Sequence, residues 1–161
     1  MLALYSYRGL LTALLGVLLL FLPVAPFEFA GIAFFAAATF LRIWARRHIG
    51  EHSRGAELAC PKIVQSGPYK YTRHPLYISN FMAGVAFALF HSGFSLGTLI
   101  FCSIYGVFLA LLARQENIFL ESCPNKSQVS SLPIIKSIKN DRYTWLWQFL
   151  MLALIYCRKM I

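Results

Sequence analysis

Charge is scarce in this chain, and acidic residues most of all. Only six of the 161 residues are Asp or Glu, and charged residues make up 13%, about half the usual share of a soluble domain. Residues 75–113 contain no Asp, Glu, Lys or Arg, and 58% of the chain is hydrophobic. These shortages exclude an ordinary soluble domain and favour a membrane protein with several helices in lipid.

Cysteine pairs at metal-binding or redox spacing are also missing. None of the four cysteines belongs to a Cys-x-x-Cys motif, and the histidines form no ligand pattern. We therefore predict free thiols, no disulfide framework and no metal site. The cysteines are Cys60, Cys102, Cys123 and Cys157.

The net charge of +9 comes from basic residues that are unevenly placed. Seven lie within residues 42–73 and five within residues 114–142, whereas the predicted outer turns near Pro23 and His91 have none. Such an asymmetry is typical of the positive-inside pattern. It places loops 46–74 and 114–142 in the cytoplasm, and it argues against a nucleic-acid partner.

The apolar blocks predict one all-α domain over residues 1–161, a polytopic bundle of four to five transmembrane helices whose cytoplasmic loops form the functional site. The expected spans are about residues 9–26, 27–45, 75–91 and 93–113, with a possible fifth at 143–157. The last apolar block, residues 144–157, would make only ~21 Å of helix. A fifth span and a helix lying at the interface remain equal alternatives for it.

A candidate site lies where the first cytoplasmic loop enters the third span. Pro75 suits the first turn of a helix, so Arg73 and His74 flank a helix N-terminus, where free N–H groups and the helix dipole favour an anion. Arg73 can add a bidentate contact to a carboxylate, and Tyr77 in the first turn can reach back. The alternative for these residues is anchoring to lipid headgroups.

A second piece of the site is predicted at the inner end of the fourth span. A hairpin turning at His91 brings Glu116 back beside Arg73 and Tyr77. Its carboxylate can pair with Arg73, or accept hydrogen bonds from an ammonium or from hydroxyl groups of a ligand. The alternative is a helix-end salt bridge of little energetic consequence.

The run Gly67-Pro68-Tyr69-x-Tyr71-x-Arg73-His74-Pro75-x-Tyr77, just before a helical hairpin, resembles a motif of the integral-membrane isoprenylcysteine carboxyl methyltransferase and phospholipid methyltransferase superfamily. The preceding Leu41-Arg42-x-Trp44-Ala45 is also similar. The resemblance covers roughly residues 40–121. It implies S-adenosylmethionine as cofactor and an enzyme of the bacterial inner membrane or the endoplasmic reticulum.

By this resemblance, the cofactor is held by two elements, with Arg73 and His74 as the catalytic residues. Asn117 stands where the family has a second glutamate, and Ser79 where it has a glycine. After Leu120 the chain departs from the family's pattern, so the resemblance does not specify the acceptor. The residues carried over as cofactor-binding are Tyr69, Arg73, His74, Pro75, Tyr77, Glu116 and Asn117.

The expected partners are membrane lipids and a lipophilic or lipidated methyl acceptor. A carboxyl group is the leading acceptor, with a phospholipid amine or a small thiol as runner-up. Two other classes of function remain open: a non-catalytic membrane protein with a degenerate site that binds lipid or a partner, and a purely structural membrane subunit.

Overall fold

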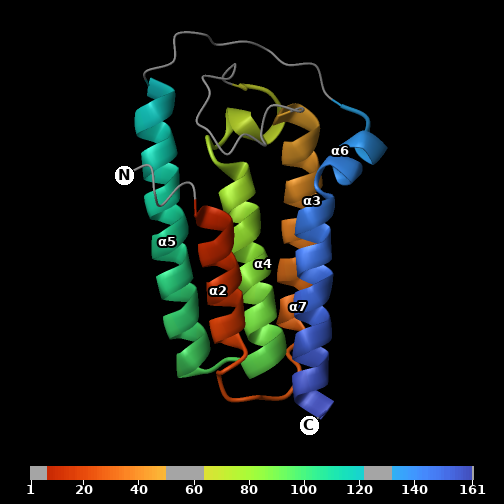
Figure 1. The fold of residues 1–161 in the computed structure, drawn as a ribbon. Coiled ribbons are helices and arrows are strands. Elements are labelled where there is room, and N and C mark those ends of the chain that lie inside the picture. The colour runs from red at the N-terminus through yellow and green to blue at the C-terminus, as the bar shows by residue number, and fades with distance from the viewer. Residues whose placement is uncertain (1–6, 50–63, 122–131, 161) are drawn as a thin grey trace.

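The computed structural model describes residues 7–49, 64–121 and 132–160 (Figure 1). Every regular element in these ranges is helical, so the predicted all-α class is confirmed for them. Residues 50–63 of the first loop and residues 122–131 of the second loop, with Cys60 and Cys123 among them, lie outside the described residues. Cys102, which is partly buried, and Cys157, which is exposed, are free cysteines.

Five long helices run alternately up and down the bundle (Figure 1). They are α2 (Arg8–Leu19), α3 (Ala30–Ile49), α4 (Pro75–Ser92), α5 (Leu96–Glu121) and α7 (Arg142–Met160). Two short elements, the 3-10 turn η2 (Gly67–Lys70) and the helix α6 (Ile134–Asn140), lie at one end. We call this end, which also carries His74 and Asp141, the loop end.

Helices α3 and α4 form the tightly packed centre of the fold. Small residues let their backbones approach, as is common between membrane helices. A Cβ added at Gly31 would lie 2.6 Å from the Phe90 ring. The hydroxyl of Ser79 donates to the carbonyl of Ala38 at 2.9 Å, which satisfies a buried polar group. This pair fixes α4, and therefore its N-terminus at His74, against the rest of the bundle.

Helix α2 is shorter than the predicted first span. It ends at Leu19 rather than near residue 26, because the ring of Pro23 clashes with a helical carbonyl four residues earlier. Twelve helical residues extend only ~18 Å, against a hydrocarbon core of ~30 Å. Helix α5 differs in the opposite sense: it continues through the polar residues 114–121, where Arg, Gln and Glu are good helix formers.

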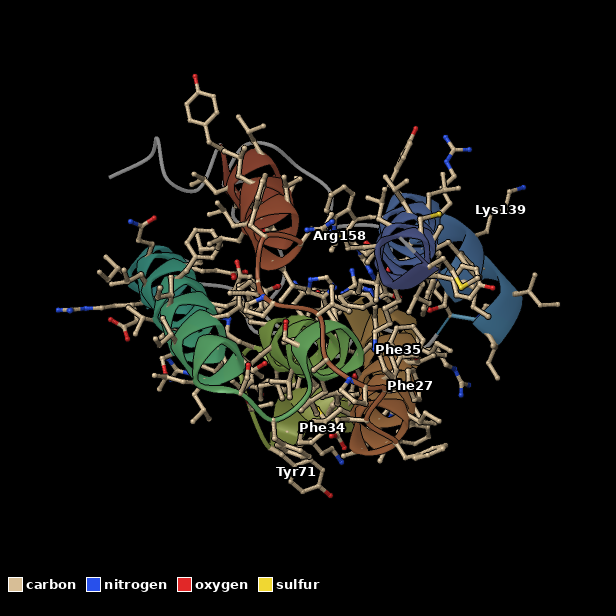
Figure 2. All side chains as sticks on the ribbon, turned by 90° about the horizontal axis from the view of Figure 1, so that it is seen from below. Phe27, Phe34, Phe35, Tyr71, Lys139 and Arg158 are labelled. Carbon is tan, nitrogen blue, oxygen red and sulfur yellow. The ribbon has the colours of Figure 1, made fainter. Side chains whose placement is uncertain are left out.

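The outer surface of the bundle is rich in exposed apolar side chains. Phe40 is 68% exposed, Phe149 70% and Leu96 72%, and side chains project outward around the whole cross-section in Figure 2. One described helical stretch, Leu96–Ile118 of α5, is long and apolar enough to cross a bilayer, and only 22% of its most apolar window is buried. So many exposed apolar side chains are typical of a surface that contacts lipid or another protein.

Helix α7 extends along the same length of the bundle as the helices beside it. At its last turn, Lys159 donates to the carbonyl of Ala25, at 2.6 Å, in the turn between α2 and α3. That turn is also tied to α4, because the N–H of Ala25 donates to the carbonyl of His91 at 3.0 Å. Helix α7 therefore runs the length of the bundle, and its polar last turn lies at the end opposite the loop end.

Candidate functional site

The loop that leads into α4 is docked on the end of α3. Gly67 begins η2 with φ +59°, a left-handed conformation that glycine adopts without steric cost. A Cβ there would also overlap the ring of His48. His48 Nδ1 lies 3.0 Å from the hydroxyl of Ser66, so the last turn of α3 holds this loop by contact and by hydrogen bonding.

His74 is the centre of the site. It is the N-cap residue of α4, with Pro75 as the first helical residue. Its Nε2 lies 2.9 Å from Asn117 Oδ1, and its Nδ1 lies 3.4 Å from Glu116 Oε2. The α4–α5 hairpin thus brings the Arg-His-Pro motif beside Glu116, at the position that the sequence predicts.

The ion pairs of the site differ from the Arg73–Glu116 pair that the sequence left open as one alternative. Glu116 faces His74 rather than Arg73. Arg73 instead lies 3.7 Å from Glu121, and both side chains are about 70% exposed. Exposed pairs of this kind contribute little to stability. The guanidinium of Arg73 is therefore accessible at the rim of the site.

The environment of His74 favours its protonated form. Burial acts to lower the pKa of this imidazole, but its hydrogen bonds with Glu116 and Asn117 and the negative charge of Glu116 outweigh burial and raise the pKa above its usual value. Asn117 Oδ1 and the Glu116 carboxylate are both acceptors, so the protonated ring can donate to one from each nitrogen. This arrangement favours the imidazolium form of His74.

Two tyrosines complete the site, and a third lies away from it. The hydroxyl of Tyr69 is buried and has no hydrogen-bond partner among the described residues. Burial, reinforced by Glu116 and opposed by Arg46, raises the pKa of Tyr69, so this phenol stays protonated. The Tyr77 ring lies 5.5 Å from the His74 ring. Tyr71 is 83% exposed and points away, as Figure 2 shows.

Comparison with known proteins decides the family. The phospholipid methyltransferase family model matches residues 26–123, more than half of the chain, and this match includes His74, Glu116 and Asn117. The chain belongs to the phospholipid methyltransferase family. The predicted resemblance is therefore confirmed at the level of the family. No curated protein and no solved structure matches the chain.

This member of the phospholipid methyltransferase family has a buried ionic network that the sequence analysis missed. Arg42 of α3 pairs with Asp141, and Arg46 Nη2 lies 2.7 Å from the same carboxylate. Arg42 also donates to Asn80 Oδ1 at 2.5 Å and to the Thr144 hydroxyl at 2.8 Å. Burial opposes ionisation of Asp141, but Arg42 and Arg46 outweigh it and lower the pKa of the carboxyl.

One signal for this network was present in the sequence. Arg42 falls inside the predicted second span, and an ionisable residue there is rare unless it has a partner or a function. Its partner could not be named, because the network joins the inner end of α3 to the start of α7, 99 residues later. The two arginines share one carboxylate, and we call this group (Arg42, Arg46 and Asp141) the buried network.

A cavity of about 490 Å³ opens beside the network, between α2, α4, α5 and α7. This volume is within the usual range of ligand pockets. Tyr77 lines the cavity and also contacts His74, so cavity and site adjoin at that residue. Apolar side chains line most of the cavity, with Arg42 and Asn80 among its polar residues.

Proposed function

We propose that this protein transfers a methyl group from S-adenosylmethionine to a lipophilic acceptor at the cytoplasmic face of a membrane. The observation that carries the proposal is the convergence of His74 with Glu116 and Asn117, within a chain of the phospholipid methyltransferase family. Anchoring to lipid headgroups does not account for an inward-facing histidine with these two partners.

The donors and acceptors present suit the polar groups of S-adenosylmethionine. The exposed guanidinium of Arg73 would bind the cofactor's carboxylate, and Glu116 would accept from its ammonium or ribose hydroxyls. The unpartnered hydroxyl of Tyr69 fits a further hydrogen bond, and the Tyr77 ring offers an apolar face. When bound, the cofactor would supply the methyl group, which is attached to a sulfonium sulfur that serves as the leaving group.

The state of His74 bears on the acceptor. An amine or thiol acceptor needs to lose a proton, and general-base catalysis needs a group able to accept one. Both ring nitrogens of His74 face acceptors, Asn117 Oδ1 and the Glu116 carboxylate, and its pKa is raised, so it is poorly suited to accept a proton. A carboxylate attacks without losing a proton, so this site suits a carboxyl acceptor better than a phospholipid amine or a thiol. The role left to His74 is to orient Glu116 and the bound groups.

We place the loop end in the cytoplasm and the long helices across the membrane. The excess of Lys and Arg in loops 46–74 and 114–142 supports this orientation. The apolar stretch of α5 supports insertion of that helix, and because α7 runs the length of the bundle we propose it as the fifth span. A lipophilic acceptor would then enter from the bilayer and the cofactor from the cytoplasm.

A non-catalytic membrane protein with a degenerate site is the alternative function. Asn117 favours it, because an amide replaces the second carboxylate of the family pattern and is engaged by His74. Cofactor binding separates the two functions. A protein that folds and does not bind S-adenosylmethionine would be a lipid- or partner-binding relative of the enzymes.

The test is calorimetric titration of the purified protein in lipid nanodiscs with S-adenosylmethionine and S-adenosylhomocysteine. We expect micromolar binding that Arg73→Ala abolishes without unfolding, since the pair with Glu121 is solvent-exposed. Arg142→Ala is the matched control: it removes the same group from an exposed residue whose contacts are with Tyr143. Unchanged binding by Arg73→Ala would contradict the site assignment.

A further inference from the structure

Helix α6 is held at a defined level beside the last turns of α3. The N–H of Leu132, just before the helix, donates to the carbonyl of Arg47 at 2.8 Å, and Arg47 Nε donates to the carbonyl of Leu132 at 3.3 Å. Just after the helix, Asp141 pairs with Arg42. Arg42 and Arg47 are separated by ~7.5 Å along the axis of α3. These contacts fix α6 on the outside of the bundle at the loop end (Figure 1).

The side of α6 that faces away from the bundle is apolar. Ser137 is 1% exposed, whereas Ile135 is 82% exposed, and Ile134 and Ile138 are exposed as well. At ~100° of rotation per residue, the three isoleucines fall within a sector of ~100° on one side of the helix. An apolar sector of this width is typical of a helix that buries it against another surface.

The exposed charges around this sector all have one sign. The charged residues within 132–142 are Lys136, Lys139, Asp141 and Arg142. The one acid, Asp141, is 1% exposed and belongs to the buried network. Lys139 follows the isoleucines around the helix, and its side chain lies at the outer edge of the molecule in Figure 2. The segment thus presents isoleucines next to exposed basic residues, which is the pattern of a helix that lies on an anionic lipid surface.

A lipid surface fits α6 better than a protein partner does, because of the level at which α6 is held. That level includes Trp44, which lies between Arg42 and Arg47 on α3 and whose ring is 6.0 Å from the ring of the exposed Phe40. A Trp at the end of an apolar helix is typical of the headgroup layer of a membrane. Helices in this layer bury an apolar face at the boundary of the acyl chains and keep Lys and Arg among the headgroups.

We propose that α6 is an interfacial helix that binds anionic lipid headgroups at the membrane surface. Its isoleucines insert beside the upper part of the acyl chains, and Lys139 and Arg142 contact the negatively charged headgroups. Helix α6 lies beyond the residues that match the family model, which end at 123. The contact therefore goes beyond the activity of the family. It rests on the proposed insertion of the bundle in a membrane, and it does not depend on methyl transfer.

The depth of α6 is measured with a fluorophore on the whole protein in nanodiscs. The four native cysteines are replaced by alanine, and bimane is attached to Ile135→Cys. Phe149→Cys is the reference for the lipid core, because this side chain is 70% exposed in the middle of α7. Glu121→Cys is the reference for water, since its side chain is 71% exposed at the end of α5. The quenchers are phosphatidylcholine brominated near the headgroup, phosphatidylcholine brominated near the chain end, and iodide.

We expect lipid brominated near the headgroup to quench the Ile135 probe most, and lipid brominated near the chain end to quench the Phe149 probe most. Ile138→Cys provides a second probe on α6 and should behave as Ile135→Cys does. Quenching of both α6 probes by iodide alone would overturn the proposal. Protection from iodide and from lipid would also overturn it, by showing that a protein such as a second copy covers α6. If the Phe149 probe is not quenched by lipid either, the proposed membrane insertion fails, and this proposal fails with it.

Brominated phosphatidylglycerol tests the charge of the headgroup. At equal mole fraction it should quench the Ile135 probe more strongly than phosphatidylcholine brominated at the same position. One Lys or Arg near a membrane surface changes anionic-lipid binding by roughly fivefold, so Lys139→Gln should lower this preference by up to that factor. Arg158→Gln is the matched control, because it removes one charge from an exposed residue at the opposite end of α7. Equal preferences in these two variants, or no preference in the unsubstituted helix, would refute binding of anionic headgroups.

Discussion

Removal of the Asp141 carboxylate is the sharpest test of the buried network. Asp141 is 1% exposed and is the shared partner of Arg42 and Arg46. Asp141→Asn keeps the shape of the side chain and removes the carboxylate that pairs with both guanidiniums. Breaking a buried pair from one side costs about 3–5 kcal/mol. For a chain of this size, that corresponds to a fall in Tm of roughly 6–20 °C.

The assay is thermal unfolding in nanodiscs, followed by tryptophan fluorescence at one fixed heating rate, since unfolding of such proteins is commonly irreversible. Glu121→Gln is the matched control, because it removes a carboxylate from the exposed pair with Arg73 and should cost about 0–1 kcal/mol. If Asp141→Asn lowers Tm no more than this control does, the network does not stabilise the fold.

Two further measurements separate a charge effect from a packing effect. In the Asp141→Asn background, Arg42→Gln should recover part of the loss, because it removes the buried guanidinium that paired with the missing carboxylate and the two changes are coupled. The second is pH dependence. The pKa of Asp141 is lowered in the folded state, so its stabilisation is present above the unfolded value near 3.8 and is lost as pH falls through the folded value. The Asn variant should lack this acid-dependent loss.

Three other predictions concern the site itself. Asn117→Glu restores a second carboxylate and should tighten S-adenosylmethionine binding in calorimetry; unchanged affinity would place residue 117 outside the cofactor shell. Glu116→Gln removes the charge that raises the pKa of His74. The Tm of this variant should therefore fall furthest below that of the unsubstituted protein at pH values under about 6.5, and the difference should shrink as pH rises through the folded pKa of His74. A Tm difference that does not change with pH would contradict the His74–Glu116 pair. In Gly67→Ala the alanine has to adopt the left-handed φ of this position, and its Cβ clashes with the last turn of α3, at a cost of about 1–3 kcal/mol. Gly9→Ala, where the new Cβ lies in open space, should be neutral or stabilising. Equal Tm values for these two variants would refute this reasoning.

The sequence predicted the existence of the helices better than their ends. Hydropathy marks where charge begins, and it ended the fourth span at residue 113, although Arg, Gln and Glu continue the helix to Glu121. In α2 the limit was steric, since Pro23 ends the helix at Leu19 before the apolar run is finished. A boundary set by helix propensity or by proline sterics is not visible in a hydropathy profile.

The candidate site, too, could be predicted only in part from the sequence. Glu116 could be placed beside the Arg-His-Pro motif because one hairpin of known length connects them. The choice of His74 over Arg73 as its partner depends on side-chain directions at the helix N-terminus, and sequence spacing does not give these directions. Asp141 escaped prediction altogether, because its contact with Arg42 depends on how α7 docks against α3.

The buried ion pairs can form only late in synthesis, because Asp141 is translated after Arg42 and Arg46. Asp141 is 99 residues later in the chain than Arg42, so at translation rates of about 5–20 residues per second its partner is made roughly 5–20 s later. During that interval the guanidinium of Arg42 has to be solvated by other groups, and the ion pairs that join α3 to the start of α7 form only after residue 141 has been made. A chain that stops before residue 141 would keep α3 and lose the buried carboxylate that ties it to α7.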